Sequence, residues 1–180
     1  MPRARVKRAA GSPIGPVNLA PTKALIPSDA AVAIICTKDG RYLLQHRDPK
    51  PTIFYPDHWG FFGGALEHEE SPAEGLLREL QEELSIDFSG HNKALFTHFS
   101  FHVQAAGLNA LNRYYYELKI DPEEVASMRL QEGAGMALVG GEEALHEIRL
   151  VPYDAFALWL HFHQGMLMPG KASPIKRWAV

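Results

Sequence analysis

The sequence predicts a single domain of the α/β or α+β class, in which helices cover a mixed β-sheet. The order of segments supports this fold, because strand-like segments precede, flank and follow helix-like ones. The composition agrees: 46% of the 180 residues are hydrophobic and 22% are charged, which is enough apolar material for one core. A third observation is a strongly amphipathic helix near the middle of the chain. The chain contains no internal repeats.

The first elements form a predicted hairpin. Residues 30–38, "AAVAIICTK", are apolar and rich in β-branched side chains, which is typical of a buried strand. Asp39-Gly40 is a strong turn signal, and residues 41–47 form the predicted return strand. A loop with three prolines follows, and "WGFFGG" at 59–64 predicts a short strand that ends in a glycine turn.

The central helix has complete start signals. Ser71 is the expected N-cap, Pro72 takes the first helical position and Glu74 completes a capping box. Apolar residues then recur at helical spacing and form a stripe for packing against the core, namely Ala73, Leu76, Leu77, Leu80 and Leu84.

The second half of the chain predicts further elements of both kinds. Residues 94–105 and 111–120 are expected to form a strand pair, with Gly107 and Asn109 near its turn. A short helix or turn is expected from Pro122, a strand at 135–140 and a helical turn at 142–146. The C-terminal helix is expected at 152–164.

Charge divides the chain into three predicted regions. Residues 1–28 hold five bases, five prolines and no acid, which predicts a flexible basic arm. Residues 29–168 form the predicted domain, and 169–180 a C-terminal tail. The chain outside the arm holds 13 bases and all 21 acids, a net charge of −8. Such a charge argues against a stable nucleic-acid partner.

The single cysteine limits the chemistry and the compartment. Cys36 alone provides neither a disulfide framework nor a cysteine-based zinc site, and it lies in a predicted buried strand. We therefore expect a reducing, cytoplasmic compartment. No apolar run reaches the length of a membrane span, so no membrane partner is expected.

Three carboxylates share one side of the central helix. Stepping about 100° per residue places Glu79, Glu82 and Glu83 next to one another, beside the leucine stripe. No lysine is spaced to neutralise them, and clustered carboxylate oxygens are the ligands of a hard divalent cation such as Mg²⁺. Gly75 lies one turn away on the same side, and we hypothesise that it leaves room for a ligand or for an oxygen that a metal binds.

This stretch, residues 64–86, resembles the signature of the Nudix hydrolase family, whose members include MutT-like proteins. Every charged position of the family pattern is matched at its spacing. One position departs, since Ser85 replaces the usual glycine at the helix end, where we expect a reshaped terminus. The matching residues are Gly64, Glu70, Arg78, Glu79, Leu80, Glu82, Glu83 and Ile86.

The resemblance implies a fold, a cofactor and residue roles. The fold would be an α/β/α sandwich with a mixed β-sheet, covering about residues 30–165. Mg²⁺, with Mn²⁺ as the alternative, would be held by Glu79, Glu82 and Glu83 together with the carbonyl of Gly64. Glu70 would support the metal site, and Arg78 would orient a carboxylate.

The general base that takes a proton from the attacking water stays open at this point. An acid of the helix or a glutamate of a later loop could serve. Among the loop acids, Glu142 and Glu143 in "GGEEALH" are the candidates, of which we select Glu143, and Glu132 is a weaker candidate. The alternative interpretation is that Glu143 is only a solvated acid at the start of a helix.

Three residues are candidates for contacts with the nucleotide. Arg47 could contact phosphate, and Trp59 and Tyr116 could stack on a base. Packing roles explain these residues equally well. In the strand, Tyr114 and Tyr116 are expected on one face of the sheet and Tyr115 on the other.

The histidines are assigned structural or surface roles. His98 and His102 would stand about 13 Å apart on a strand, too far for one ion. His161 and His163 would point away from each other on a helix.

We therefore predict a pyrophosphohydrolase that acts on a nucleoside diphosphate linked to another moiety, such as a nucleotide sugar, ADP-ribose or a dinucleotide. House-cleaning hydrolysis of nucleoside triphosphates is the alternative substrate class. A non-catalytic Nudix module that binds a nucleotide is the competing kind of function, and isomerase chemistry on isoprenoid diphosphates is a weaker one. A homodimer is left open by the aromatic and proline-rich segments.

Overall fold

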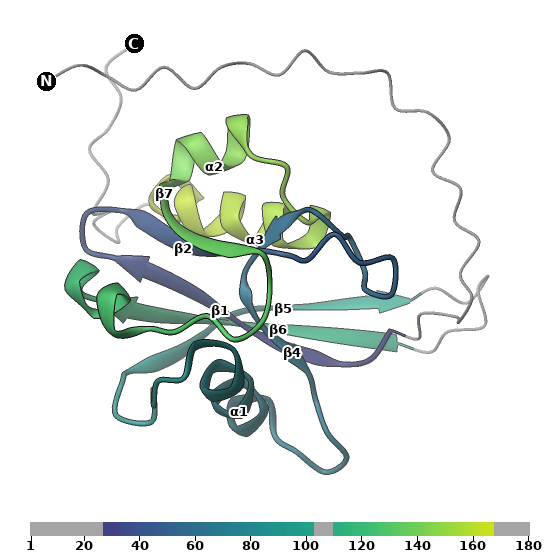
Figure 1. Cartoon of the computed structure of the whole chain (residues 1–180). Coiled ribbons are helices and arrows are strands. Elements are labelled where there is room, and N and C mark those ends of the chain that lie inside the picture. Colours follow the sequence, from purple (N-terminus) through teal and green to yellow (C-terminus); the bar gives the residue numbers. More distant parts are fainter. Residues whose placement is uncertain (1–26, 103–109, 168–180) are drawn as a thin grey trace, which may run out of the picture.

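A computed structural model describes residues 27–102 and 110–167. Seven strands form one mixed sheet with the order β3-β2-β1-β6-β5, while β4 pairs with β1 and β7 pairs with β2 (Figure 1). Strand β1 (Ala30–Thr37) runs parallel to β6 (Ala110–Ile120) and antiparallel to β2 (Arg41–His46). The predicted mixed sheet is confirmed.

Helices cover both faces of this sheet. Helix α1 (Pro72–Leu84) lies on one face, and α2 (Gly141–Glu147) and α3 (Pro152–Phe162) lie on the other (Figure 1). Strand β1 supplies both cores, because successive side chains of a strand point to opposite faces. Ile35 packs in the cluster with Leu80 of α1, whereas Ile34 packs in the cluster with Leu158 of α3.

The region "WGFFGG" differs from its prediction. It forms two short strands, β3 (Trp59–Gly60) and β4 (Phe62–Ala65), instead of one. Strand β3 pairs with β2, and β4 pairs with β1, so the chain changes partner at Phe61. Gly63 then has a φ of +122° and lies so close to the backbone of β1 that a Cβ would come within 2.8 Å of the Val32 Cα. The close passage, which only glycine permits, sets Gly64 beside α1.

Helix α1 begins as predicted and ends more regularly than predicted. The side chain of Ser71 accepts a hydrogen bond from the backbone N–H of Glu74, and the Glu74 carboxylate accepts one from the Ser71 N–H in return. At the other end Ser85 adopts the left-handed conformation, with φ 54° and ψ 33°, and its N–H donates to the Gln81 carbonyl. The expectation of a reshaped terminus is therefore wrong, since the serine takes the conformation that the family's glycine would have.

The remaining elements follow their predictions closely. Strand β5 (Lys93–His102) pairs with β6, and β7 (Gly135–Gly140) pairs with β2. The 3₁₀ helix η2 (Pro122–Ser127) follows β6, and the short helix α4 (Gln164–Leu167) follows α3. The predicted turn at Gly107 and Asn109, nearly all of the basic arm and the C-terminal tail lie outside the described residues. Within the described ranges, the helices are too short or too polar to cross a membrane.

Candidate metal and catalytic site

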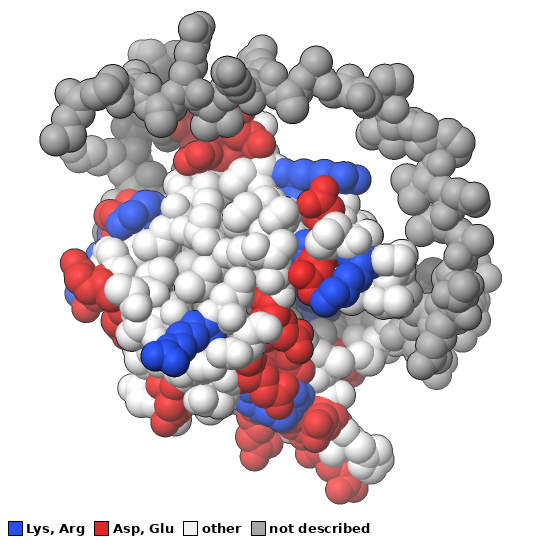
Figure 2. Space-filling view, viewed as in Figure 1, with Lys and Arg blue, Asp and Glu red and all other residues white. Residues whose placement is uncertain are grey.

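Helix α1 and the segment before it carry a group of four carboxylates, Glu70, Glu79, Glu82 and Glu83, which we call the acidic cluster. Figure 2 shows acidic side chains gathered in the lower part of the view, around α1. The leucine stripe holds the adjacent side of the helix in the core, with Leu76, Leu80 and Leu84 fully buried. Amphipathic packing thus fixes the direction of these carboxylates, with Glu82 exposed and Glu83 buried.

Arg78 organises the cluster. Its Nε and Nη2 donate to the two oxygens of Glu70 at 2.9 and 3.0 Å, in a bidentate pair. Its Nη1 donates to Glu79 at 2.8 Å and to Glu82 at 3.4 Å, and Nη2 also reaches the carbonyl of Ala65 at 2.9 Å. The hydrogen bonds from Arg78 lower the pKa of Glu70. Both Glu70 oxygens are therefore committed to Arg78, which fits the supporting role that the resemblance implies.

Glu83 is the buried member of the cluster, with 7% of its surface exposed. Its Oε2 accepts from the Gly63 N–H at 2.8 Å and its Oε1 from Gln45 Nε2 at 3.0 Å. Burial raises the pKa of Glu83 to about 7, and the charges of Glu79 and Glu132 act in the same direction. Such a carboxylate is stabilised in its charged form by a bound cation.

Glu79 and Gly64 are in direct contact. A Cβ at Gly64 would come within 2.5 Å of the Glu79 Cδ, so the glycine leaves the space that this carboxylate occupies. Burial raises the pKa of Glu79, while the hydrogen bond from Arg78 opposes that effect. Strand β4 and helix α1 thus meet at these two residues.

The donor set fits a hard divalent cation. Glu79, Glu82 and Glu83 would supply carboxylate oxygens, and Gly64, which contacts Glu79, would supply its backbone carbonyl. Mg²⁺ prefers such oxygen ligands and is commonly completed by substrate phosphates. In the described part of the chain, the bonds from Arg78 engage only Oε1 of Glu79 and Oε2 of Glu82, so the other oxygen of each can serve as a ligand.

The hypothesis about Gly75 is wrong. A Cβ there would lie 2.5 Å from Leu66 Cδ2 and 2.7 Å from Glu70 Oε2. The space at Gly75 is thus filled by the side chains of Leu66 and Glu70, which leave no room there for a ligand. The glycine instead lets Glu70 approach the helix, where it pairs with Arg78.

The structure does not bring Glu143 to the acidic cluster. Its helix, α2, packs through Ala144 into the cluster of Ile34 and Leu158, on the opposite face of the sheet from α1 (Figure 1). Glu132 is better placed. Its carbonyl accepts from Gln45 Nε2 at 3.2 Å, and the neighbouring Gln131 N–H donates to the carbonyl of Glu83 at 2.8 Å.

The three predicted nucleotide contacts do not form one group. Tyr116 packs on the α1 face of the sheet, whereas Trp59 packs in the cluster on the α3 face. The ring of Trp59 stacks on that of His46, with 4.8 Å between the ring centroids. Arg47 donates through Nε to the Phe54 carbonyl in the proline-rich loop. The predicted alternation is confirmed, with Tyr114 and Tyr116 on the α1 face and Tyr115 on the other. Of the three, Tyr116 alone faces the side of the acidic cluster.

Sequence reasoning missed Gln45 and Gly63. Gln45 is buried in β2 and its amide joins Glu83 of α1 to the loop at Glu132. The strand pattern gave one signal, since a glutamine within an apolar strand suggests a buried polar partner.

Comparison with known proteins adds two kinds of similarity. A family model described as a NUDIX domain matches residues 27–170. Among curated proteins, an 8-oxo-dGTP diphosphatase of Proteus vulgaris is 42% identical over 57 residues, covering 32% of this chain and 49% of that protein. A dihydroneopterin triphosphate diphosphatase of Haemophilus influenzae is 34% identical over 71 residues, covering 38% and 41%. The chain thus matches about half, or less, of the length of these curated relatives.

Solved structures resemble the whole fold. The dihydroneopterin triphosphate pyrophosphohydrolase of E. coli superposes with a TM-score of 0.58 and 17% identity, covering 79% of this chain and 99% of that one. The MutT protein of Methanosarcina mazei gives a TM-score of 0.60 at 20% identity, with the same coverage. At these identities the likeness supports the fold and no finer property.

Proposed function

Because the chain belongs to the Nudix family, we propose that it is a Mg²⁺-dependent pyrophosphohydrolase whose substrate is a nucleoside triphosphate or a close analogue. The observation that carries the proposal is the acidic cluster, in which Glu79 contacts Gly64, Arg78 holds Glu79 and Glu82, and Glu83 accepts a hydrogen bond from the neighbouring Gly63 N–H. Clustered carboxylates repel one another, so a helix that keeps them suits a function that requires a cation.

The substrate class is proposed from the relatives. By their names, the two curated relatives are diphosphatases, one of 8-oxo-dGTP and one of dihydroneopterin triphosphate. Both names specify a triphosphate. They favour the house-cleaning alternative over the nucleotide sugars, ADP-ribose and dinucleotides that we first expected.

In the proposed reaction, residues of α1 and of the neighbouring strands hold the metal ion and orient its ligands. Glu79, Glu82, Glu83 and the Gly64 carbonyl would hold Mg²⁺, and Mn²⁺ could replace it. When bound, the cation would neutralise phosphate oxygens and lower the pKa of water. Arg78 fixes the orientation of Glu79 and Glu82, and Gln45 and the Gly63 N–H fix Glu83.

We propose Glu132 in place of Glu143 as the loop glutamate that accepts the proton of the attacking water. The loop of Glu132 is tied to Glu83 and Gln45, next to the carboxylates. A general base must lie within hydrogen-bond reach of its proton or act through one water. The carboxylates of α1 are the competing bases.

The test is a substrate panel with matched variants. Wild type, Glu82→Gln and the control Glu142→Gln are assayed with 8-oxo-dGTP, ordinary nucleoside triphosphates, nucleotide sugars and ADP-ribose, with and without Mg²⁺. We expect metal-dependent release of pyrophosphate from a triphosphate and wild-type rates in Glu142→Gln. In Glu82→Gln we expect kcat to fall by about 100-fold or more, because a bound metal stabilises the transition state by several kcal/mol. Bound nucleotide without any turnover would favour the non-catalytic module.

The same assay tests the base. We expect Glu132→Gln to lower kcat by about 100-fold or more, within the range for loss of general-base catalysis, and Glu143→Gln to leave it unchanged. Full turnover in Glu132→Gln would assign proton transfer to an acid of α1.

A further inference from the structure

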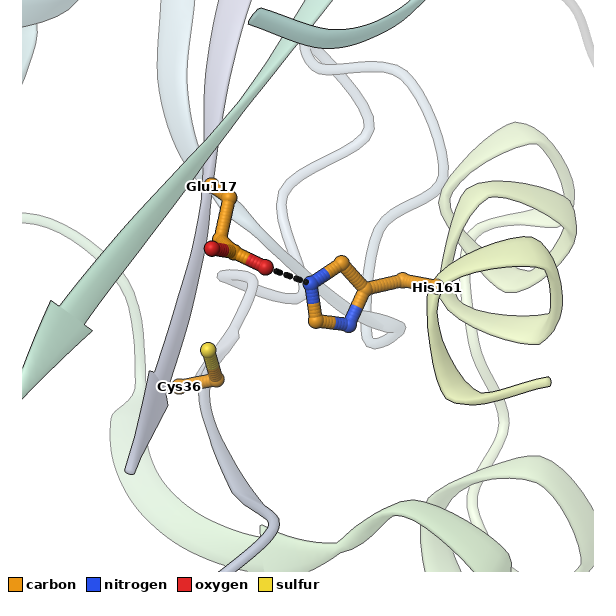
Figure 3. A group of neighbouring side chains, drawn as sticks. All are labelled: Cys36, Glu117 and His161. Atoms are coloured by element: carbon orange, nitrogen blue, oxygen red, sulfur yellow. Dashed lines mark hydrogen bonds and ion pairs between the residues drawn. The ribbon is translucent and has the colours of Figure 1, made fainter. Parts of the chain in front are cut away.

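A second group of potential ligands lies on the α3 face, away from the acidic cluster. Cys36 of β1, Glu117 of β6 and His161 of α3 point toward one another (Figure 3). One ligand atom from each residue lies within 4.8 Å of the other two. Cys36 and His161 are each 5% exposed, and the carboxylate of Glu117 meets His161 Nε2 at 2.8 Å.

The chemistry of these three side chains is that of a transition-metal site. Zn²⁺ is bound by thiolate, imidazole and carboxylate ligands, and three protein ligands with one open position form a recognised tetrahedral arrangement. We propose that Cys36, Glu117 and His161 bind Zn²⁺ or a metal ion of similar preference. The set differs in kind from the acidic cluster, which contains only hard oxygen donors.

The distances need only small adjustments. Ligand atoms around a tetrahedral Zn²⁺ lie about 3.5 Å apart, given bonds of about 2.0–2.3 Å. The three ligand atoms lie within 4.8 Å of one another, so side-chain rotation would have to bring them about 1 Å closer. The pair of His161 and Glu117 would open slightly, because the metal replaces the hydrogen bond between them.

The surroundings orient two of the ligands. The Tyr42 hydroxyl lies 2.9 Å from Nδ1 of His161, so Nδ1 can donate to it and leave Nε2 unprotonated for the metal. Lys119 pairs with Oε1 of Glu117 at 2.9 Å, which leaves Oε2 directed at His161. Among the described residues, Tyr42 and Lys119 are the titratable side chains bonded to this group.

Binding also balances in protons and charge. The Cys36 thiol gives up its S–H proton to solvent as the sulfur–metal bond forms, since a coordinating thiol is deprotonated. The neutral His161 ring changes tautomer: the Nε2 proton that it donates to Glu117 is lost, and Nδ1 gains a proton and donates a hydrogen bond to the Tyr42 hydroxyl, so the ring stays neutral. The thiolate and the Glu117 carboxylate then neutralise the two positive charges of the ion. A bound ion would connect three elements that are far apart in sequence, so it would stabilise the packing of α3 on the sheet.

Cobalt substitution tests the site in the full-length chain, because Co²⁺ reports its ligands by absorption. A thiolate ligand gives an intense charge-transfer band in the near ultraviolet, which carboxylate ligands alone cannot give. We expect this band in wild type, its loss in Cys36→Ser, and a loss or strong weakening in His161→Gln. Two controls should keep it: His163→Gln, at the C-cap of α3 two residues further along the chain, and Glu82→Gln, in the acidic cluster.

A stability measurement accompanies the spectrum. We expect equimolar Zn²⁺ to raise the Tm of wild type by about 5 °C and that of Cys36→Ser by much less. Wild type without the charge-transfer band would overturn the proposal, and so would a band that survives in Cys36→Ser. If Cys36→Ser fails to fold, His161→Gln and the wild-type spectrum decide the question.

Discussion

Gly63 and Gly64 are adjacent, but we expect a side chain at Gly63 to lower stability and a side chain at Gly64 to lower activity. At Gly63 the φ of +122° and the close backbone of β1 leave no room for a Cβ, so Gly63→Ala should destabilise the fold. At Gly64 the obstacle is the carboxylate of Glu79, the far end of a flexible side chain. We therefore expect Gly64→Ala to lower kcat by about 10-fold or more by displacing Glu79, with a loss of stability below about 1 kcal/mol.

Urea denaturation and steady-state kinetics separate the two effects. Gly90→Ala is the matched control, because a Cβ there meets nothing within 4 Å. A Gly64→Ala enzyme with wild-type kcat would show that the position of Glu79 against the glycine is not needed for turnover.

The charged residues of the site could be predicted from the sequence, but their partners could not. Helical spacing is enough to place Glu79, Glu82 and Glu83 side by side. Nothing in that spacing indicates that Gln45 of a distant strand would hold Glu83, or that Leu66 would fill the space at Gly75. Such contacts depend on how a loop folds back, which local periodicity does not encode.

At the scale of elements, the end of α1 tests how a serine is held in a left-handed conformation. Ser85 has a φ of 54°, which is unfavourable for an L-residue by about 1 kcal/mol. Its hydroxyl accepts a hydrogen bond from Gln131 Nε2 at 2.9 Å, at an exposed position that contributes little. We expect Ser85→Gly to stabilise the fold by about 0.5 kcal/mol, since relief of strain exceeds the lost bond and the added chain entropy.

The ranking of several substitutions provides the control. Asn tolerates this conformation and Val does not, so urea midpoints should fall from Gly through Asn to Val. We expect Ser85→Val to lose about 1.5 kcal/mol relative to wild type. A Val variant as stable as wild type would contradict the assigned helix end.

The kinds of elements were predictable, while their pairing was less so. The capping box of α1 and the Asp39-Gly40 turn are local signals, and both hold in the structure. The division of "WGFFGG" into β3 and β4 depends on two different partner strands, which the segment itself does not reveal. The choice of Glu143 was wrong for a similar reason. The sequence of a helical turn does not indicate which face of the sheet the helix covers, and α2 covers the face opposite α1.

At the scale of the whole molecule, the sheet brings together residues from distant parts of the chain on each of its two faces. The acidic cluster lies on the α1 face, and Cys36, Glu117 and His161 meet on the α3 face. The count of one cysteine excludes a zinc site built from several cysteines. From the sequence, the histidines could be considered as shared metal ligands only with other histidines nearby in the chain. A mixed set of ligands drawn from β1, β6 and α3 becomes visible only through the sheet order.

The two-sided core makes a prediction about β1 itself. Ile34 and Ile35 are both fully buried, one in each cluster. In a sheet with only one covered face, one of two successive residues would face solvent. We expect Ile34→Ala and Ile35→Ala each to lower the free energy of unfolding by about 3 kcal/mol through lost burial and cavity formation. Leu95→Ala, at a side chain that is 54% exposed, should change it by about 0.5 kcal/mol or less.

Activity distinguishes the two faces. Ile35 packs with Leu76 and Leu80 beneath the acidic helix, whereas Ile34 packs beneath α3. We expect Ile35→Ala, assayed well below its Tm, to lower kcat several-fold, because α1 would pack less firmly against the sheet. We expect Ile34→Ala to leave kcat near that of wild type. Equal effects of both substitutions on kcat would mean that the position of the carboxylates depends on the stability of the whole domain, and not on the α1 face in particular.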